Sequence, residues 1–205
     1  MSHCSRFNIN FKDKHILFKA MRNLNMNPEN QVWSSYKSNL GKMIGFHGSV
    51  IGKLLTGTFN GINIFFTEES QCFVMNVESH KFSIDQLSQA SKNIAQLLQK
   101  EYTKCSLEKL QRDIIRTGEF ASLTKEVREE SDIYILTIGT SGRKLIVLIN
   151  KDGEVLEEVH GVTGKSCIDL TFAFESCITD TIQRQWAPEY NETIEDRVIQ
   201  VLNLV

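Results

Sequence analysis

The sequence predicts an α+β protein with mainly antiparallel strands, in which a curved sheet with two helical segments is followed by a ββα module. Short apolar clusters that alternate with polar residues, or are separated by glycine, predict half-buried strands. Apolar residues at helical spacing after residue 83 predict the two helical segments. The composition suits a folded core, because 41% of the 205 residues are hydrophobic and 23% are charged.

The first elements are a strand and a helix. Phe7, Ile9 and Phe11 alternate with polar residues, which is the period of a strand with one buried face. Asp13 is a typical N-cap, and apolar residues recur at helical spacing from there to Leu24.

A glycine-punctuated meander of short strands comes next. Asn60-Gly61 gives the clearest hairpin signal in this region, because both residue types accept positive φ. The predicted strands are 32–36, 42–47, 50–55, 62–66 and 72–77.

The helical segments lie between this meander and two further strands. Ser83 starts the first segment as a capping residue, and Gly118 ends the second, which spans 107–115. Strands are then predicted at 120–127 and 133–138.

The pattern of the residues after 138 indicates a separate unit. Residues 139–142 (Gly-Thr-Ser-Gly) are the best linker candidate, so we expect one domain over 1–138 and a companion module over 143–205. Within this module, strands at 145–149 and 155–159 precede a helix over 166–182, and Thr193 starts a C-terminal helix.

Each unit resembles a family of unknown activity. Residues 1–138 resemble the hypothetical chloroplast reading frame thirty-five family of cyanobacteria and plastids, through the Met1-Ser2-His3 opening, the helix holding Tyr102 and the Gly118-Glu119-Phe120 turn. Residues 143–192 resemble a small companion family of unknown function, often encoded beside the first, through Asp152-Gly153, the run from Gly161 to Cys167 and Pro188-Glu189-Tyr190. The resemblance implies an origin in a photosynthetic lineage and two modules that act as a pair.

Charge is distributed unevenly along the chain. Residues 1–66 hold eight Lys or Arg against two acidic residues, whereas residues 139–205 hold six against eleven. Lys12, Lys14, Lys19 and Arg22 would form a cationic helix face that contacts nucleic acid, or an ordinary solvated surface.

One motif resembles a phosphate-binding loop. Gly161, Gly164, Lys165 and Ser166 lie between a predicted strand and a predicted helix, where backbone N–H groups can hold an anion. The spacing is two residues shorter than a nucleotide-binding P-loop requires, so the alternatives are anion binding or a tight turn capped by Ser166.

Cysteine and histidine patterns indicate no metal site and no disulfide framework. The five cysteines are odd in number and none has C-x-x-C spacing, which favours a reducing compartment. No cofactor is expected from the motifs, and no apolar run approaches the length of a membrane span. Without a signal or transit pattern at residue 1, we expect the cytoplasm or the plastid stroma.

These observations favour a non-enzymatic adapter or regulatory subunit that binds a protein partner. The sequence contains no recognisable catalytic constellation, and it joins two modules that are otherwise encoded together. Nucleic-acid binding by the basic N-terminal third, and phosphate or nucleotide binding at 161–166, are the two alternatives, and the oligomeric state stays open.

Overall fold

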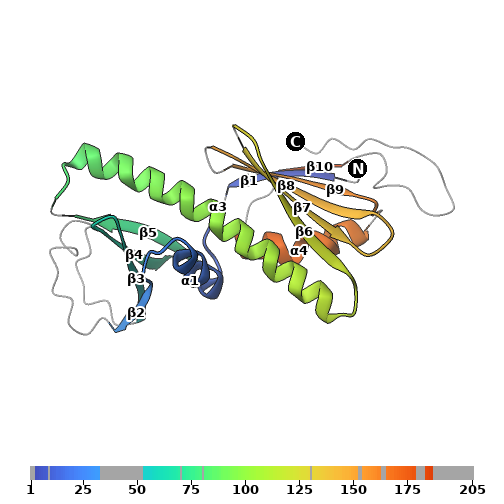
Figure 1. The fold of residues 1–205 in the computed structure, drawn as a ribbon, viewed down its shortest axis with the longest axis horizontal. Helices are drawn as coiled ribbons and strands as arrows, with labels where there is room; N and C mark the ends of the chain where they lie inside the picture. Colours follow the sequence, from blue (N-terminus) through green and yellow to red (C-terminus); the bar gives the residue numbers. More distant parts are fainter. Residues whose placement is uncertain are drawn as a thin grey trace.

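Two antiparallel sheets lie on either side of one long helix in the computed structural model (Figure 1). The structure describes residues 3–8, 10–32, 53–69, 71–79, 81–129, 131–151, 154–162, 165–178 and 183–186. The strand pairs among the described residues are all antiparallel, so the predicted α+β class is confirmed.

The larger sheet has six strands in the order β10-β1-β9-β8-β7-β6. Their bounds are β1 (His3–Asn8), β6 (Ala121–Val127), β7 (Ser131–Ile138), β8 (Arg143–Asn150), β9 (Glu154–His160) and β10 (Gln183–Trp186). Burial alternates along β8 and β9, as expected of strands with one face against helices. β10 is a strand that the sequence analysis did not predict.

Residues 139–142, which we expected to be a linker, form the turn between β7 and β8. These two strands pair over their full length, from Ser131 opposite Asn150 to Ile138 opposite Arg143. β1, from the start of the chain, lies between β9 and β10. Strands from both predicted modules, 1–138 and 143–205, therefore share one sheet. The division of the chain into two modules stays a prediction.

The smaller sheet has the order β2-β3-β4-β5. Its strands are β2 (Glu29–Val32), β3 (Lys53–Phe59), β4 (Ile62–Glu69) and β5 (Cys72–Glu78). Asn60 and Gly61 join β3 to β4 with φ of 51° and 79°, which is the geometry expected of this hairpin. The predicted strand at 42–47, most of that at 32–36 and half of that at 50–55 lie outside the described residues.

The two predicted helical segments are one continuous helix, α3 (Ile84–Arg116), with the predicted capping box at Ser83. At 100° per residue, the buried residues Ile94, Leu98 and Tyr102 lie on one side of α3, and Leu107 and Leu110 lie on roughly the opposite side. The side of α3 that carries Ile94, Leu98 and Tyr102 faces α1 and β5. The side that carries Leu107 and Leu110 packs on β6 and β7. The apolar stripe changes side because α3 packs against both sheets. In the sequence, this change of side gives the pattern of two separate helical segments.

Two shorter helices complete the described fold. α1 (Lys14–Asn23) packs against α3 through Ile16, Leu17, Ala20 and Met21, and Asp13 is its N-cap as predicted. α4 (Lys165–Ile178) packs beside α3 against the larger sheet (Figure 1). The predicted C-terminal helix from Thr193 lies outside the described residues.

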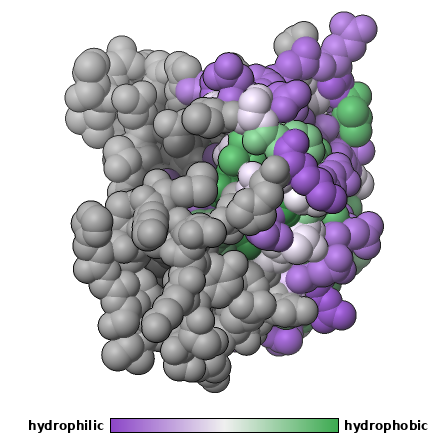
Figure 2. Space-filling view, turned by 90° about the vertical axis from the view of Figure 1, so that its left-hand side faces the viewer, coloured by the Kyte–Doolittle hydropathy of each residue, from purple (hydrophilic) through white to green (hydrophobic). Residues whose placement is uncertain are grey.

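All the described buried apolar side chains except Phe65 and Ile133 belong to one connected cluster, which contains residues of both sheets and of all three helices named above. Figure 2, which views the end of the molecule that carries the smaller sheet, shows apolar side chains gathered in the middle of the face among hydrophilic ones. The described part of the chain thus has a continuous core, in which α3 packs against both sheets.

Candidate functional site

The segment between β1 and α1 is the point where the two sheets meet. The Asn10 N–H donates to the Ile178 carbonyl at the end of α4 (2.6 Å), and the Phe73 N–H of β5 donates to the Phe11 carbonyl (2.6 Å). The Phe11 ring is buried and makes edge-to-face contacts with Phe66 and Tyr102, with centroids 5.9 Å and 5.2 Å apart. This short segment therefore holds α3, α4 and the smaller sheet in one place.

Tyr102 of α3 is the central polar residue of this junction. Its hydroxyl accepts hydrogen bonds from the backbone N–H groups of Lys12 (3.1 Å) and Asp13 (2.8 Å), and it donates to the Cys177 carbonyl (2.7 Å). A phenolic hydroxyl has one proton to donate, and here that proton is used. Burial raises the pKa of Tyr102 far above its ordinary value, so the group stays protonated at neutral pH.

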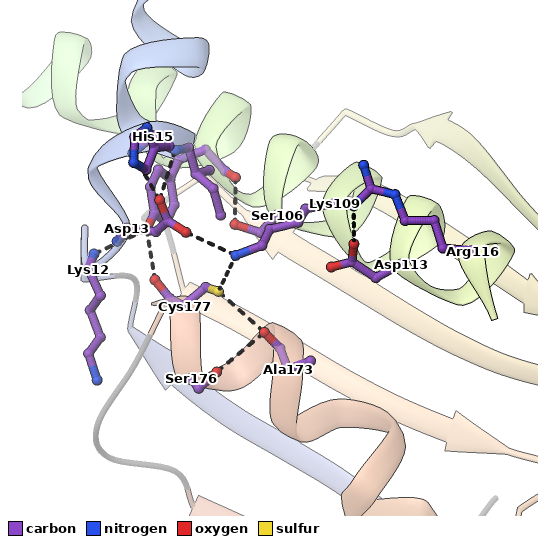
Figure 3. Close-up of polar contacts among 12 residues, drawn as sticks. Lys12, Asp13, His15, Ser106, Lys109, Asp113, Arg116, Ala173, Ser176 and Cys177 are labelled. Atoms are coloured by element: carbon purple, nitrogen blue, oxygen red, sulfur yellow. Dashed lines mark hydrogen bonds and ion pairs between the residues drawn. The ribbon is translucent and has the colours of Figure 1, made fainter.

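Asp13 and Lys109 form an ion pair beside this hydroxyl (Figure 3). Lys109 Nζ lies 3.0 Å from Asp13 Oδ2 and 3.8 Å from Cys177 Sγ, so the ammonium sits between a carboxylate and a thiol. Partial burial by itself opposes the charge of Asp13, but hydrogen bonds from Lys109 and from the backbone of Ile16 and His15 outweigh it and lower its pKa. The hydrogen bond to Asp13 likewise raises the pKa of Lys109.

An open cleft of about 630 Å³ lies against this cluster. We call it the junction cleft. Three segments that are distant in the sequence line it: Lys12, Asp13, Lys14 and His15; Gln71 and Phe73; and Ser176 and Cys177. Its volume is in the range of ligand-binding sites, and its lining combines cations, hydrogen-bonding groups and one aromatic ring.

The cleft is lined mainly by groups suited to binding. Asp13 is engaged by Lys109 and by the cap of α1, and Tyr102 is saturated with hydrogen bonds and stays protonated. General acid–base catalysis needs a group that exchanges its proton near neutral pH, and neither of these two does so. Lys12 extends away from the Asp13–Lys109 pair in Figure 3, which places its ammonium toward the periphery of the cluster.

The four residues predicted to contact nucleic acid are in different environments. Lys12 and Lys14 line the cleft. Lys19, five residues after Lys14 on α1, forms an ion pair with Glu108 of α3. Arg22 is exposed two turns beyond Lys14. Their contact with nucleic acid stays a prediction, and the charge of Lys19 is compensated by Glu108.

The structure describes three of the four predicted anion-binding residues, and their role stays a prediction. Gly161 has a φ of +70°, and a Cβ built on it would lie 3.1 Å from the carbonyl oxygen of Gly142. A side chain at this position would be strained by the positive φ and crowded by the β7–β8 turn. Lys165 and Ser166 are the first two residues of α4, and Gly164 lies outside the described residues.

Sequence reasoning found the role of Asp13 as a cap but missed its partner Lys109 and the Cys177 thiol that also contacts Lys109. Lys109 and Cys177 are 96 and 164 positions away from it along the chain, so no local pattern links them to Asp13. Tyr102 was noted only through the family resemblance. An aromatic residue with a hydroxyl on the buried side of a helix is the one available signal, since such a hydroxyl needs a partner.

Metal ligands, membrane spans and cysteines complete the description of the site. Among the described residues, no group of three or more His, Cys, Asp or Glu is placed to hold a metal ion. No helix within the described ranges is long and apolar enough to cross a membrane. Cys72, Cys105 and Cys177 have free thiols.

Comparison with known proteins gives one match. Residues 145–191 match a family described as a protein of unknown function, DUF2997, which bears out the resemblance of this region to a family of unknown function. The resemblance of residues 1–138 to the chloroplast reading-frame family is not shown by this match and stays a prediction. No curated protein and no solved structure matches the chain.

The matched region supplies β8, β9, α4 and β10. In the larger sheet, β7 pairs with β8, and β1 pairs with both β9 and β10. Strands from outside the matched region therefore complete the sheet around it, and the lining of the junction cleft likewise combines residues from inside and outside the match.

Proposed function

We propose that the protein is a non-catalytic adapter or regulatory subunit that binds a segment of a partner protein in the junction cleft. The observation that carries the proposal is the cleft itself, which is open, about 630 Å³ in volume and lined from three separate parts of the chain. An open groove accepts an extended segment more readily than an enclosed pocket would.

The rigidity of the lining supports this proposal. The backbone of Lys12, Asp13 and Cys177 is held by the Tyr102 hydroxyl, and Phe73 is held by its hydrogen bond to Phe11. A site whose backbone is already fixed loses less conformational entropy when a ligand binds. Exposed polar side chains remain above this fixed frame to select the partner.

The composition of the lining also supports binding over chemistry. Two groups of catalytic type at the junction are committed to structural contacts, because Asp13 is paired to Lys109 and caps α1, and Tyr102 bridges three backbone groups. Proton transfer by either of these two groups would require breaking contacts that hold the junction together. Recognition of a partner would leave all of them in place.

Photo-crosslinking tests whether a protein occupies the cleft. A photoreactive phenylalanine analogue in place of Ser176, which lines the cleft and is exposed, is expected to capture one reproducible partner from a native extract. The same analogue in place of Lys144, an exposed residue of β8 outside the cleft lining, serves as the matched control.

Blocking the cleft provides the second arm. When unlabelled chains compete with this capture, we expect Lys144→Trp to compete as well as the unmodified chain. We expect Ser176→Trp not to compete, because its side chain would occupy the cleft. Equal capture from both positions, or full competition by Ser176→Trp, would remove the cleft as the binding site.

A further inference from the structure

We infer that β6 binds a second copy of this chain, with the two β6 strands side by side and antiparallel across a two-fold axis. The larger sheets of the two molecules then form one continuous sheet. This inference goes beyond the proposed function and does not depend on it, because the residues of β6 lie outside the lining of the junction cleft.

The outer side of β6 is the best-defined free sheet edge in the structure. The two sheets end at the strands β10, β6, β2 and β5. β10 and β2 border residues that the structure does not describe, and Phe11 bridges the outer side of β5 at Phe73. All seven residues of β6 are described, and within the described ranges β6 pairs only with β7.

Hydrogen bonds at both ends of the β6–β7 pair define which backbone groups of β6 point outward. At one end, the Gly139 N–H donates to the Phe120 carbonyl (2.8 Å). At the other end, Arg128 and Ser131 each donate to the carbonyl of the other. Hydrogen-bonded pairs alternate along an antiparallel ladder, so the even-numbered residues of β6 bond to β7 and the odd-numbered residues point away from it.

The outward groups of β6 are available to another strand. The Ala121 carbonyl accepts a hydrogen bond from Gln111 Nε2, which agrees with its outward direction. At Leu123, Lys125 and Val127, the outward N–H and C=O groups have no hydrogen-bond partner among the described residues. Such a row of backbone groups is a template for pairing with a further strand.

The sequence of β6 is complementary to itself in one register. Odd-numbered residues have to lie opposite odd-numbered residues, because only these direct backbone groups outward. A pairing centred on Thr124 meets this condition and aligns the whole strand, 121–127, with its copy. Pairings centred on Lys125 or Glu126 also meet it, but they place like charges directly opposite each other, which is unfavourable. The register centred on Thr124 avoids this repulsion by setting Lys125 opposite Leu123.

Lys125 does not block this edge. A lysine on an edge strand commonly prevents pairing through its charge. Here the ammonium of Lys125 lies 3.3 Å from Oδ2 of Asp132 and 5.3 Å from the ring centroid of Tyr134, and both of these residues belong to β7. The charge is therefore compensated and directed back over the sheet, away from the incoming strand.

Exposed apolar side chains flank the same edge. Val127 is 73% exposed, and Ile115 near the end of α3 is 50% exposed. In the register centred on Thr124, Val127 lies opposite Ala121 of the copy. Gln111, whose side chain reaches Ala121, is four residues before Ile115 and hence on the same side of α3. Pairing therefore brings Val127 toward Ile115 of the copy and removes apolar surface from water.

Charge substitutions at the centre of this register test the inference on the full chain. We expect sedimentation velocity to show that the unmodified protein dimerises increasingly with concentration. Thr124 is exposed, and Thr124→Lys or Thr124→Glu should each weaken dimerisation by at least about tenfold, because position 124 lies opposite itself. An equimolar mixture of the two variants should dimerise again, because a lysine then faces a glutamate.

The matched controls are Thr58→Lys and Thr58→Glu, which change an exposed threonine of β3 in the smaller sheet and should leave the dimer intact. The melting temperature of each variant checks that it is folded, and dimerisation of the mixture is itself a property of folded chains. These controls separate the loss of one edge contact from a general effect of charge.

Each outcome has a defined meaning. Loss of the dimer in both Thr124 variants and its return in their mixture support the inference. An unmodified chain that stays monomeric at every concentration overturns it, as does a dimer that both Thr124 variants retain, or a mixture that stays monomeric. Failure of capture at position 176 would refute the adapter function and leave the β6 dimer standing, so the two failures are distinguishable.

Discussion

Replacing Tyr102 by phenylalanine removes one hydroxyl and with it three hydrogen bonds at the junction of the two sheets. The Lys12 and Asp13 N–H groups lose their acceptor, and the Cys177 carbonyl loses its donor. The ring itself is fully buried and is kept by the substitution. Any change in stability therefore reports on the hydroxyl contacts alone.

The size of the effect follows from these three bonds. Each intramolecular hydrogen bond contributes about 0.5–1.5 kcal/mol net, and a buried group left without a partner costs about 1–3 kcal/mol. The freed backbone groups are only partly buried, so water can replace part of what is lost. We expect Tyr102→Phe to lower the free energy of unfolding by about 2–3 kcal/mol.

Urea unfolding followed by far-UV circular dichroism measures this change, and Tyr134→Phe is the matched control. Tyr134 is as deeply buried in β7, but its hydroxyl makes no hydrogen bond to the other described residues. We expect the control to change stability by less than about 0.5 kcal/mol. Equal effects of the two substitutions, or an effect of Tyr102→Phe below about 0.5 kcal/mol, would refute the role assigned to this hydroxyl.

Three further predictions address charge, packing and cooperativity. The pKa of Asp13 is lowered in the folded state, so its charge stabilises the fold above the unfolded-state pKa of about 3.9 and this contribution is lost as the pH falls through the folded-state pKa. Asp13→Asn keeps a capping side chain but loses the pair with Lys109, and should cost up to about 1 kcal/mol at pH 7 and less below about pH 4; a cost that does not change with pH would contradict this. Gly57→Ala should destabilise by about 1–3 kcal/mol, because its Cβ would lie 2.5 Å from the Met26 carbonyl oxygen, whereas Thr58→Ala on the exposed side should be nearly neutral; equal melting temperatures of the two variants would argue against the close contact. Because the described core is one cluster, hydrogen exchange of both sheets should report the same global unfolding free energy, and two separate values would show that the core is divided.

The local elements were predictable because their signals are local. The cap at Asp13 and the capping box at Ser83 need only residues within three positions, and the Asn60-Gly61 turn needs only two residue types that accept positive φ. The α+β class followed from the same short-range periodicities.

The sheet partners were not predictable in this way. A strand's sequence sets which face is buried, but not which strand lies beside it. The glycines at 139 and 142 are equally compatible with a linker and with a hairpin turn, and only the pairing of β7 with β8 decides between them. The same is true of β1, whose neighbours β9 and β10 come from the other end of the chain.

By itself, the sequence determined the class of the fold, the caps and turns, and the excess of positive charge near the N-terminus. Only the tertiary structure decided which of these charges are paired, since it joins Lys19 to Glu108 and Lys109 to Asp13, and places Lys14 in the lining of the cleft. The physical reason is range. Capping and periodicity act between near neighbours in the chain, whereas the junction cleft depends on residues more than 150 positions apart that meet only when α3 packs against both sheets.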